Sequence, residues 1–152
     1  FPNTTDLRRK MKKKNLKHIK NKIKSLKKKC WKLFSLYRRL QESDRNGYCQ
    51  CITCGMRGHY KTFNAGHYKH EVLDYASLNI WPQCVRCNKW LSGNLSEYSM
   101  FLLKKFGQEK LENLHIRASM ALKGERYTQT DLEEMAKNLT VRCAELLQAK
   151  NG

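Results

Sequence analysis

Two cysteine pairs, Cys51-Ile52-Thr53-Cys54-Gly55 and Cys84-Val85-Arg86-Cys87-Asn88, dominate the centre of this 152-residue chain. Each C-x-x-C turn directs two thiolates at one point, and two such turns supply the tetrahedral sulfur set that zinc prefers. Gly55 allows the chain to turn tightly behind the metal. We therefore predict one structural zinc ion, which replaces a core that so short a segment cannot build. Its ligands are Cys51, Cys54, Cys84 and Cys87.

Three further cysteines, Cys30, Cys49 and Cys143, lie outside these pairs. A total of seven is odd, and the paired spacing favours metal binding over disulfides in an intracellular chain. Cys49 competes with Cys51 as a ligand, but a C-x-C spacing does not make the usual zinc-knuckle turn. Cys30 and Cys143 fall on apolar helix stripes, so we expect them in the core.

The net charge of +18 is concentrated at the N-terminus. Residues 1–41 carry 16 of the 31 Lys and Arg residues but only one of the 13 acidic residues, Asp6. A block this basic favours a polyanionic partner, of which the nucleic-acid phosphate backbone is the commonest. We expect Lys27, Lys28 and Lys29 to contribute to DNA binding. A solvated helix face is one alternative, and a membrane-surface segment is another, although the Trp- and Phe-rich face of such segments is missing.

Apolar residues recur with strict heptad spacing in the N-terminal third of the chain. The stripe consists of Leu16, Ile19, Ile23, Leu26, Cys30, Leu33, Tyr37 and Leu40. We predict a long basic heptad helix over residues 16–46, ended by Gly47, after a disordered basic arm over residues 1–15. Such a repeat favours a supercoil with a second copy, so we expect a homodimer through this helix. Packing of the stripe on its own domain is the alternative.

The middle of the chain, residues 47–107, consists of short segments broken by Gly, Asn and Cys. Residues 60–63 and 65–68 are predicted to be two strands of a hairpin around Asn64. A helix capped by Ser96 is predicted to run to Phe106 and end at Gly107.

Residues 108–152 show helical patterns. Residues 108–121 are predicted to be helical, with Leu111, Leu114 and Met120 facing inward. The capping box Thr130-Asp131-Leu132-Glu133 is predicted to open a last helix. Its buried face is expected to carry Leu132, Met135, Leu139, Cys143 and Leu146.

Four segments form a distinctive set within residues 31–107. They are Trp31-Lys32-Leu33-Phe34-Ser35-Leu36-Tyr37, Cys49-Gln50-Cys51-Ile52-Thr53-Cys54-Gly55, Ala65-Gly66-His67-Tyr68, and residues 79–88 continued by Leu91-Ser92-Gly93-Asn94. The order of motifs is similar to that of zinc-containing HNH (His-Me finger) nucleases such as phage endonuclease VII. In this order a cysteine pair comes first, then a strand His, a central Asn, and a second cysteine pair that is followed by Asn. The segments themselves resemble the phage recombination protein NinG (Rap) family.

The resemblance implies an α+β, mostly α fold with a ββα-metal core stapled by the four-cysteine zinc. It also implies an HNH-type endonuclease, a phosphodiester hydrolase that cuts branched recombination DNA such as Holliday junctions and flaps. His67 would be the general base that takes a proton from water. Asn88 would bind a catalytic Mg²⁺ or Mn²⁺ ion, and Asn79 would hold the loop that orients His67. Arg86 and Lys89 would contact phosphate.

One position departs from the wider nuclease pattern. Many members carry Asp or His directly before the catalytic His as a second metal ligand, whereas this chain has Gly66, which cannot ligate. The substitutes that the sequence leaves open are Asn64, His70, Glu71 and Asp74. His59 and His70 also remain open as alternative zinc ligands. Trp81 and Trp90 are expected in the core around the zinc, with base stacking as a lesser alternative.

We therefore divide the chain into an arm (1–15), a heptad helix (16–46), a nuclease core (47–107) and C-terminal helices (108–152). Two rival functions remain: a non-enzymatic zinc module that binds DNA or RNA, and a sequence-specific HNH restriction or homing nuclease. The zinc module, unlike a nuclease, does not need His67. No apolar run is long enough to span a bilayer and no signal peptide is visible, so we expect a soluble protein of the cytoplasm, the host's if the chain is phage-encoded, with no membrane partner.

Overall fold

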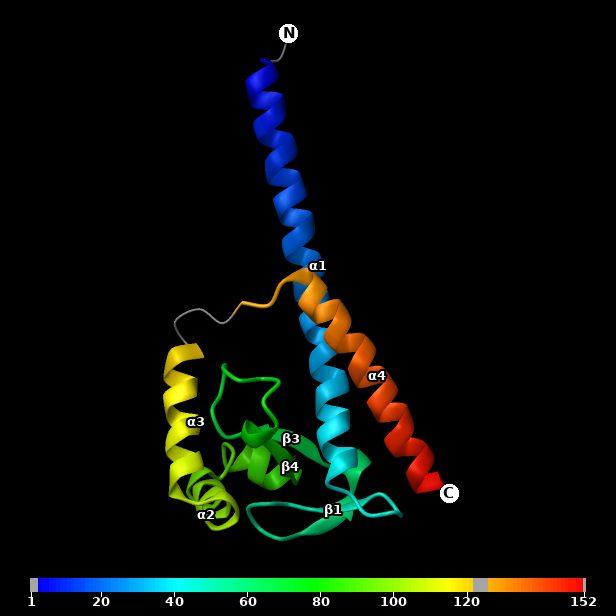
Figure 1. The fold of residues 1–152 in the computed structure, drawn as a ribbon, viewed down its shortest axis with the longest axis vertical. Coiled ribbons are helices and arrows are strands. Elements are labelled where there is room, and N and C mark those ends of the chain that lie inside the picture. Colours follow the sequence, from blue (N-terminus) through cyan, green and yellow to red (C-terminus); the bar gives the residue numbers. More distant parts are fainter. Residues whose placement is uncertain (1–2, 122–125, 152) are drawn as a thin grey trace.

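The longest element is α1 (Thr4–Gln41), a 38-residue helix whose N-terminal part extends beyond the rest of the molecule (Figure 1). This computed structural model describes residues 3–121 and 126–151. The Asn3 side chain caps the helix by accepting a hydrogen bond from the Thr5 N–H at 3.2 Å, and Asp6 pairs with Lys10 at 2.9 Å. The predicted disorder of residues 1–15 is therefore wrong from Thr4 onward, because capping and strong helix formers outweigh polarity. Residues 1–2 of that arm lie outside the described part.

The helix α4 (Gln129–Asn151) packs along the C-terminal part of α1 and covers most of its apolar stripe (Figure 1). Cys30 of α1 is buried against Leu132 and Ala136 of α4, and Ile23 and Leu26 pack against this cluster. Leu16 and Ile19 remain exposed. The stripe therefore packs on its own chain from Ile23 onward, which is the alternative that the heptad pattern left open.

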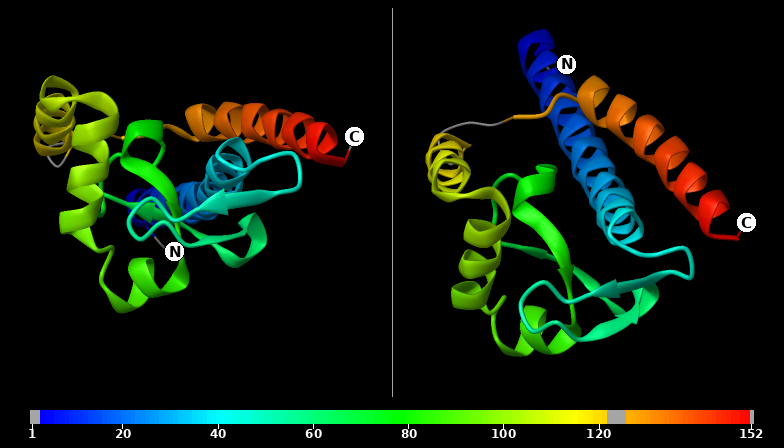
Figure 2. Two further views of the ribbon diagram at one scale, coloured as in Figure 1. Left: turned by 90° about the horizontal axis from the view of Figure 1, so that it is seen from below. Right: turned by 60° about the horizontal axis from the view of Figure 1, so that its bottom comes forward.

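Two small antiparallel sheets follow α1 in the chain. The first lies below the C-terminal end of α1, and the second lies between the α1–α4 pair and the helices α2 (Leu95–Phe106) and α3 (Gln108–Ala121) (Figures 1 and 2). β1 (Tyr48–Gln50) pairs with β2 (Arg57–His59), and β3 (Asn64–His67) pairs with β4 (Ile80–Gln83). In the second sheet Asn64 lies opposite Gln83 and His67 opposite Ile80. The π-helix η3 (Arg86–Trp90) follows β4 directly. The chain thus contains two paired strands followed by a helical segment, with the second cysteine pair at that junction.

The predicted hairpin of residues 60–63 and 65–68 is wrong. Residues 60–62 form the 3-10 helix η1 (Tyr60–Thr62), whose start is capped by the His59 side chain. The true partner of β3 is the later apolar run β4, and two buried residues, Ala65 and Ile80, face the same core. Local alternation favoured neighbouring segments, whereas burial of the strand requires the distant one.

Both ends of the heptad helix also differ from the prediction. α1 ends at Gln41, where the Glu42 N–H donates to the Arg38 carbonyl, rather than at residue 46. Gly47, with a φ of 82°, instead closes the turn into β1 by donating its N–H to the Asp44 carbonyl at 3.0 Å. A left-handed glycine can end a helix or make a turn, so its presence alone does not fix the helix end.

The predicted C-terminal helices are present. α2 (Leu95–Phe106) and α3 (Gln108–Ala121) meet at Gly107, and Leu114 is buried with Tyr98. Met120 is exposed, which contradicts its predicted inward position. Residues 122–125 and 152 of the predicted 108–152 segment lie outside the described part.

The cap of α4 lies two residues earlier than predicted. Thr128 and Asp131 exchange hydrogen bonds, with the Thr128 N–H donating to the Asp131 carboxylate at 2.7 Å. Asn94 rather than Ser96 precedes α2, in a left-handed conformation. The predicted buried face of α4 is confirmed. Its members are Leu132, Met135, Leu139, Cys143 and Leu146.

The predicted boundaries at residues 46 and 107 do not separate independent cores. Phe34 of α1, Ala65 of β3, Ile80 of β4 and Leu139 of α4 are buried in one cluster. The buried Arg38 also links α1 to β4, because its Nε donates to the Ile80 carbonyl at 2.8 Å. Among residues 3–121 and 126–151, no helix has the length and apolar character needed to cross a membrane.

Candidate active site and metal centre

His67 ends β3, and three side chains lie near its imidazole, one from α1 and two from the loop that follows β3. Its Nε2 lies 3.0 Å from Oδ1 of Asp74, and its ring stacks on Trp31 of α1 with centroids 4.5 Å apart and planes inclined by 25°. His70 lies beyond, with a centroid distance of 6.0 Å. An ionised carboxylate only accepts hydrogen bonds, so Asp74 favours the tautomer that carries its proton on Nε2. This leaves Nδ1 as the basic nitrogen.

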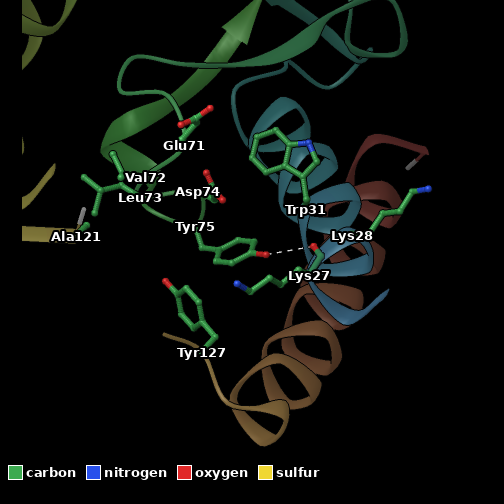
Figure 3. A pocket seen from close by; sticks show the side chains of 10 residues that line it. All are labelled: Lys27, Lys28, Trp31, Glu71, Val72, Leu73, Asp74, Tyr75, Ala121 and Tyr127. Atoms are coloured by element: carbon green, nitrogen blue, oxygen red, sulfur yellow. Dashed lines mark hydrogen bonds between the residues drawn. The ribbon is translucent and has the colours of Figure 1, made fainter. Parts of the chain in front are cut away.

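A pocket of about 330 Å³ opens between α1 and the loop that follows β3 (Figure 3), and its lining includes Trp31 and Asp74, the two residues that contact His67. Trp31, Lys27 and Lys28 line it from α1, and the carboxylates of Glu71 and Asp74 line it from the loop. The Tyr75 hydroxyl ties the two sides together by donating to the Lys27 carbonyl at 3.2 Å. The pocket is therefore lined by both cationic and acidic residues.

Asn79 closes η2 (Ser77–Asn79) and is fully buried beneath the loop that joins β3 to η2. Its Oδ1 accepts a hydrogen bond from the Lys69 N–H at 2.7 Å. Its Nδ2 donates to the carbonyls of Lys69 at 3.0 Å, Val72 at 3.2 Å and Leu73 at 3.4 Å. The loop also contains two left-handed residues, Glu71 and Leu73, a strained conformation that these contacts hold in place.

Gly66, the residue before His67, has no room for a side chain. A Cβ built there would lie 2.0 Å from Oε1 of Gln83 and 3.0 Å from Oδ1 of Asn88. Two amide oxygens therefore occupy the space in which a side chain at this position would lie. Tyr98 holds the same point from α2, because its hydroxyl donates to the Gly66 carbonyl at 2.8 Å.

Gln83 has an unusual environment beside Asn88. Its Nε2 donates to the Gly93 carbonyl at 2.8 Å and to the Thr53 hydroxyl at 3.2 Å, which fixes the orientation of the amide. Its Oε1 is buried and finds no hydrogen-bond donor in the described part of the chain. A buried carbonyl oxygen without a donor is costly, and a hard divalent cation is one group that satisfies it.

The four predicted zinc ligands converge. The sulfur atoms of Cys51, Cys54, Cys84 and Cys87 all lie within 4.8 Å of one another. The Sγ atoms of Cys54 and Cys84 are 3.8 Å apart, which equals the edge of about 3.8 Å expected for a tetrahedron with zinc–sulfur bonds of about 2.3 Å. The residues present therefore fit a zinc ion.

The electrostatics of the cluster also suit a cation. Burial and neighbouring thiols raise the pKa of Cys54 to about 12, because thiols this close cannot all ionise alone. Around Cys51, hydrogen bonds from Thr53 and backbone groups outweigh burial and lower the pKa to about 6. One thiolate is thus already favoured, and a divalent cation would supply the charge that the others need.

The other candidate ligands lie outside this cluster. Cys49 is buried in the adjoining core, and burial raises its pKa to about 11. Cys30 and Cys143 are buried at the α1–α4 contact, as predicted, and donate to backbone carbonyls. Among the described residues, the convergent group consists of the four thiols, without His59 or His70.

The predicted phosphate-binding residues occupy different surfaces. Arg86 and Lys89 are exposed on η3, beside Asn88. Lys27 and Lys28 line the pocket beside His67, whereas Lys29 lines a groove between α1 and α4. The structure therefore places two of the three predicted lysines of α1 near the candidate site.

The sequence did not assign a role to two residues of the site. Trp31 belongs to a segment that carries the family resemblance, yet its contact with His67 joins residues far apart in the chain. Gln83 also lies in such a segment, but its buried oxygen has no signature in a single sequence. Trp81 is buried as expected, whereas Trp90 is 80% exposed and contradicts the prediction that it lies in the core.

Comparison with known proteins adds a family relationship. The family model described as "Bacteriophage Lambda NinG protein" matches residues 3–149 of this chain. Protein ninG of Escherichia phage lambda is 31% identical over 107 residues, which cover 66% of this chain and 51% of that protein. No solved structure matches this chain.

Other curated relatives carry the same name. Protein ninG of Escherichia phage 933W is 35% identical over 79 residues, covering 49% of this chain and 38% of the relative. Protein ninG of Salmonella phage P22 is 34% identical over 85 residues, covering 51% and 40%. The chain thus spans about half or less of the length of these relatives.

Proposed function

The chain belongs to the bacteriophage lambda NinG protein family, and from the geometry around His67 we propose that it is a metal-dependent endonuclease of the His-Me finger type. We propose branched DNA formed during recombination, such as four-way junctions and flaps, as its substrate. The cell in which it acts would be the phage's host, where such DNA lies in the cytoplasm. The single observation that carries this proposal is that His67, oriented by Asp74 and Trp31, lies beside Gly66, on which Asn88 and Gln83 converge.

The order of elements supports the assignment. β3 ends in His67, β4 runs antiparallel to it, and η3 then carries Asn88. The antiparallel pairing brings the strand that bears the base next to the segment that bears the oxygen ligand. The fully buried Asn79 holds the intervening loop. We interpret this order of elements as that of a ββα-metal site, in which a zinc ion held by the four cysteines would replace a larger core.

In the proposed reaction His67 accepts a proton at Nδ1 from the water that attacks the phosphorus atom. Asp74 holds the opposite nitrogen and stabilises the imidazolium that forms. Asn88 Oδ1, with Gln83 Oε1, is the oxygen pair that would hold the divalent ion. When bound, such an ion neutralises charge on the phosphate and on the leaving oxygen.

The cations on the surface would position the substrate. Lys27 and Lys28 lie at the pocket beside His67, and Arg86 and Lys89 are exposed beside Asn88. The N-terminal part of α1 is exposed and basic over several turns, so it would add a long-range attraction to phosphate. Phosphate contacts of this kind set register and orientation rather than sequence preference. This is why we favour a structure-specific nuclease over a restriction or homing nuclease.

A cleavage assay tests the proposal. Wild type and His67→Ala are compared on four-way, flap and plain duplex DNA, with Mg²⁺ or Mn²⁺ and after chelation. We expect wild type to cut branched DNA only with the divalent ion, and His67→Ala to lose at least about 10²-fold in rate with unchanged zinc content and DNA affinity. The exposed basic helix alone would equally suit a zinc module that only binds nucleic acid. That module would be favoured if wild type fails to cut any of the DNA substrates with or without the divalent ion, or if His67→Ala cuts at the wild-type rate.

A further inference from the structure

Trp90 is the most exposed of the large hydrophobic side chains in the described part of the chain, with 80% of its surface accessible. The chain has three tryptophans; Trp81 is 5% exposed and Trp31 is half-buried against His67. An indole is large and apolar, so tryptophan is highly buried on average. An indole exposed to this extent is available for contact with a partner, and its surroundings decide which kind of partner it suits.

The backbone that carries Trp90 is held rigidly. The Leu91 N–H donates to the Arg86 carbonyl at 2.9 Å, which makes the π-type turn, and the Gly93 N–H donates to the Cys87 carbonyl at 2.9 Å. The Asn94 amide donates to Sγ of Cys87, a predicted zinc ligand, at 3.7 Å. A π-turn is frequent at functional sites, and here it connects Trp90 to the four-cysteine cluster through Cys87.

The turn that follows Trp90 stores strain and touches the candidate active site. Ser92, Gly93 and Asn94 all adopt positive φ angles, of 50°, 89° and 47°. A Cβ on Gly93 would lie 3.6 Å from Nε2 of His70 and 3.9 Å from the carbonyl of His67. Left-handed non-glycine residues persist where the surroundings over-determine them, often beside functional sites. The turn that begins after Trp90 therefore passes beside His70 and the backbone of His67, and Trp90 itself stands two residues after Asn88 in the chain.

The charge around Trp90 selects the kind of partner. Arg86 and Lys89 flank it on the same short helix, and both are exposed. The sequence between Asp74 and Glu97 contains no acidic residue. An exposed aromatic ring on the same short helix as two cations complements a nucleic-acid strand, which offers an aromatic base together with a phosphate. A protein partner would need no such concentration of positive charge, and a membrane would need a wider apolar face.

We propose that Trp90 stacks on an unpaired base of DNA and so directs the chain to branch points and other places where bases are exposed. This inference rests on the proposed function, since it names the feature of the substrate that the same site reads. In a plain duplex the bases are stacked on one another, and an indole can reach their faces only after they are unstacked. At a branch or in a bubble the base is already unpaired, so the indole can reach it without the free-energy cost of unstacking.

The test compares binding of wild type, Trp90→Ala and Trp90→Phe to a splayed-arm DNA and to a fully paired duplex of the same length, without added Mg²⁺ or Mn²⁺. Ile116→Ala serves as a matched control, because Ile116 is an exposed apolar residue on α3. The emission of Trp90 is obtained as the difference between wild type and Trp90→Phe. Its quenching by acrylamide is recorded with and without each DNA, and cleavage is recorded separately after Mg²⁺ is added.

We expect Trp90→Ala to weaken binding to splayed-arm DNA by about 5- to 150-fold, the range measured for loss of one stacked base, and Trp90→Phe to weaken it less. Duplex binding should change little, and only splayed-arm DNA should shield Trp90 from acrylamide. Each of four results would overturn the inference. Wild type and Trp90→Ala could bind splayed-arm DNA equally, or the protein could fail to bind DNA at all. Acrylamide quenching of Trp90 could also stay unchanged on DNA, or Trp90 could be shielded by raising the protein concentration alone. Shielding without any cleavage would instead overturn the nuclease and leave the stacking intact.

Discussion

The indole of Trp31 lies against the imidazole of His67, with 4.5 Å between ring centroids and 25° between planes. Trp31 projects from α1 and His67 ends β3, so the contact joins the long basic helix directly to the candidate base. Asp74 holds the Nε2 edge of the same imidazole at 3.0 Å. Together the two neighbours fix the tilt and the rotation of the ring, which is what a general base needs in order to meet its water.

Replacement of Trp31 by Ala should therefore lower the rate of DNA cleavage more than it weakens DNA binding. A misplacement of the base by about 1 Å is enough for a loss of about 10²-fold, whereas substrate affinity depends on other groups. Trp31→Phe keeps a ring against His67 and should recover most of the rate. Single-turnover cleavage at saturating DNA and separate binding curves measure the two effects. Equal losses for Ala and Phe, or a loss in affinity alone, would show that the stack does not position the base.

The sequence located this site only in part. It pointed to His67, Asn79 and Asn88 through the family resemblance of the short segments that carry them. The partners of His67 come from residue 31 and from a loop, and a single sequence carries no signal for contacts between such distant segments. The sequence also marked Gly66 as a departure, but the reason lies in three dimensions, where Gln83 and Asn88 fill the space beside it.

Zinc content should depend on all four converging cysteines. We expect one zinc ion for each chain, with zinc–sulfur distances of about 2.3 Å by X-ray absorption. Cys84→Ser should remove most of the zinc and loosen the β4–η3 junction, because the other three thiols remain close but lose one corner of the tetrahedron. Cys49→Ser is the matched control, since Cys49 is buried outside the cluster. Full zinc occupancy in Cys84→Ser would refute the ligand set.

Loss of the Asn79 side chain should destabilise the protein and release the loop beside His67. Asn79→Ala leaves the Lys69 N–H and up to three carbonyls without their partner. Each buried polar group left unpaired costs about 1–3 kcal/mol, so the free energy of unfolding should fall by at least about 2 kcal/mol. Urea unfolding measures the loss, and amide exchange of Lys69 should accelerate. Asn138→Ala, an exposed position on α4, should change neither quantity; slow exchange of Lys69 in Asn79→Ala would argue against this role.

The exposed part of α1 should govern how steeply DNA binding falls with salt. Lys12, Lys13 and Lys14 are exposed and lie where α1 extends beyond the body of the molecule (Figure 1). Replacing all three by Gln should reduce the slope of log affinity against log salt by up to about 2.7, because each phosphate that a lysine neutralises contributes about 0.9 to that slope. Binding curves at several salt concentrations give the slope. The control is a variant with Lys110→Gln and Lys137→Gln, which removes exposed positive charge from α3 and α4. If its salt slope falls by as much for each lysine removed, the net charge of the protein, and not the position of the lysines on α1, determines the slope.

The fold was predictable where a pattern is local. The heptad stripe marked the apolar face of α1 correctly from Ile23 onward, although it missed the buried Phe34, and the last helix was correctly given its buried face. Periodicity identifies such faces but does not say what covers them. In this chain the two faces cover each other, since Cys30 of α1 is buried with Leu132 of α4. A second copy of the helix and a distant helix of the same chain leave the same signal in the sequence.

This packing changes what is expected of assembly. Of the stripe, Leu16 and Ile19 remain exposed, whereas Ile23 and Leu26 pack towards α4. Two exposed positions give about one heptad, which is too short to hold two highly basic helices together against their repulsion. DNA phosphate would relieve that repulsion. We therefore expect free protein to be monomeric and pairing through Leu16 and Ile19 to occur on junction DNA.

Two double variants separate the roles of the stripe. Leu16→Asp with Ile19→Asp should leave the free energy of unfolding unchanged but abolish pairing on DNA, because both residues are exposed. Ile23→Asp with Leu26→Asp should instead lower that free energy by at least about 2 kcal/mol, since carboxylates replace side chains packed against α4. Light scattering with and without four-way junction DNA reports the mass, and urea unfolding reports stability. A wild type that stays monomeric on junction DNA would exclude the homodimer, and a stable Ile23 and Leu26 variant would contradict the α1–α4 contact itself.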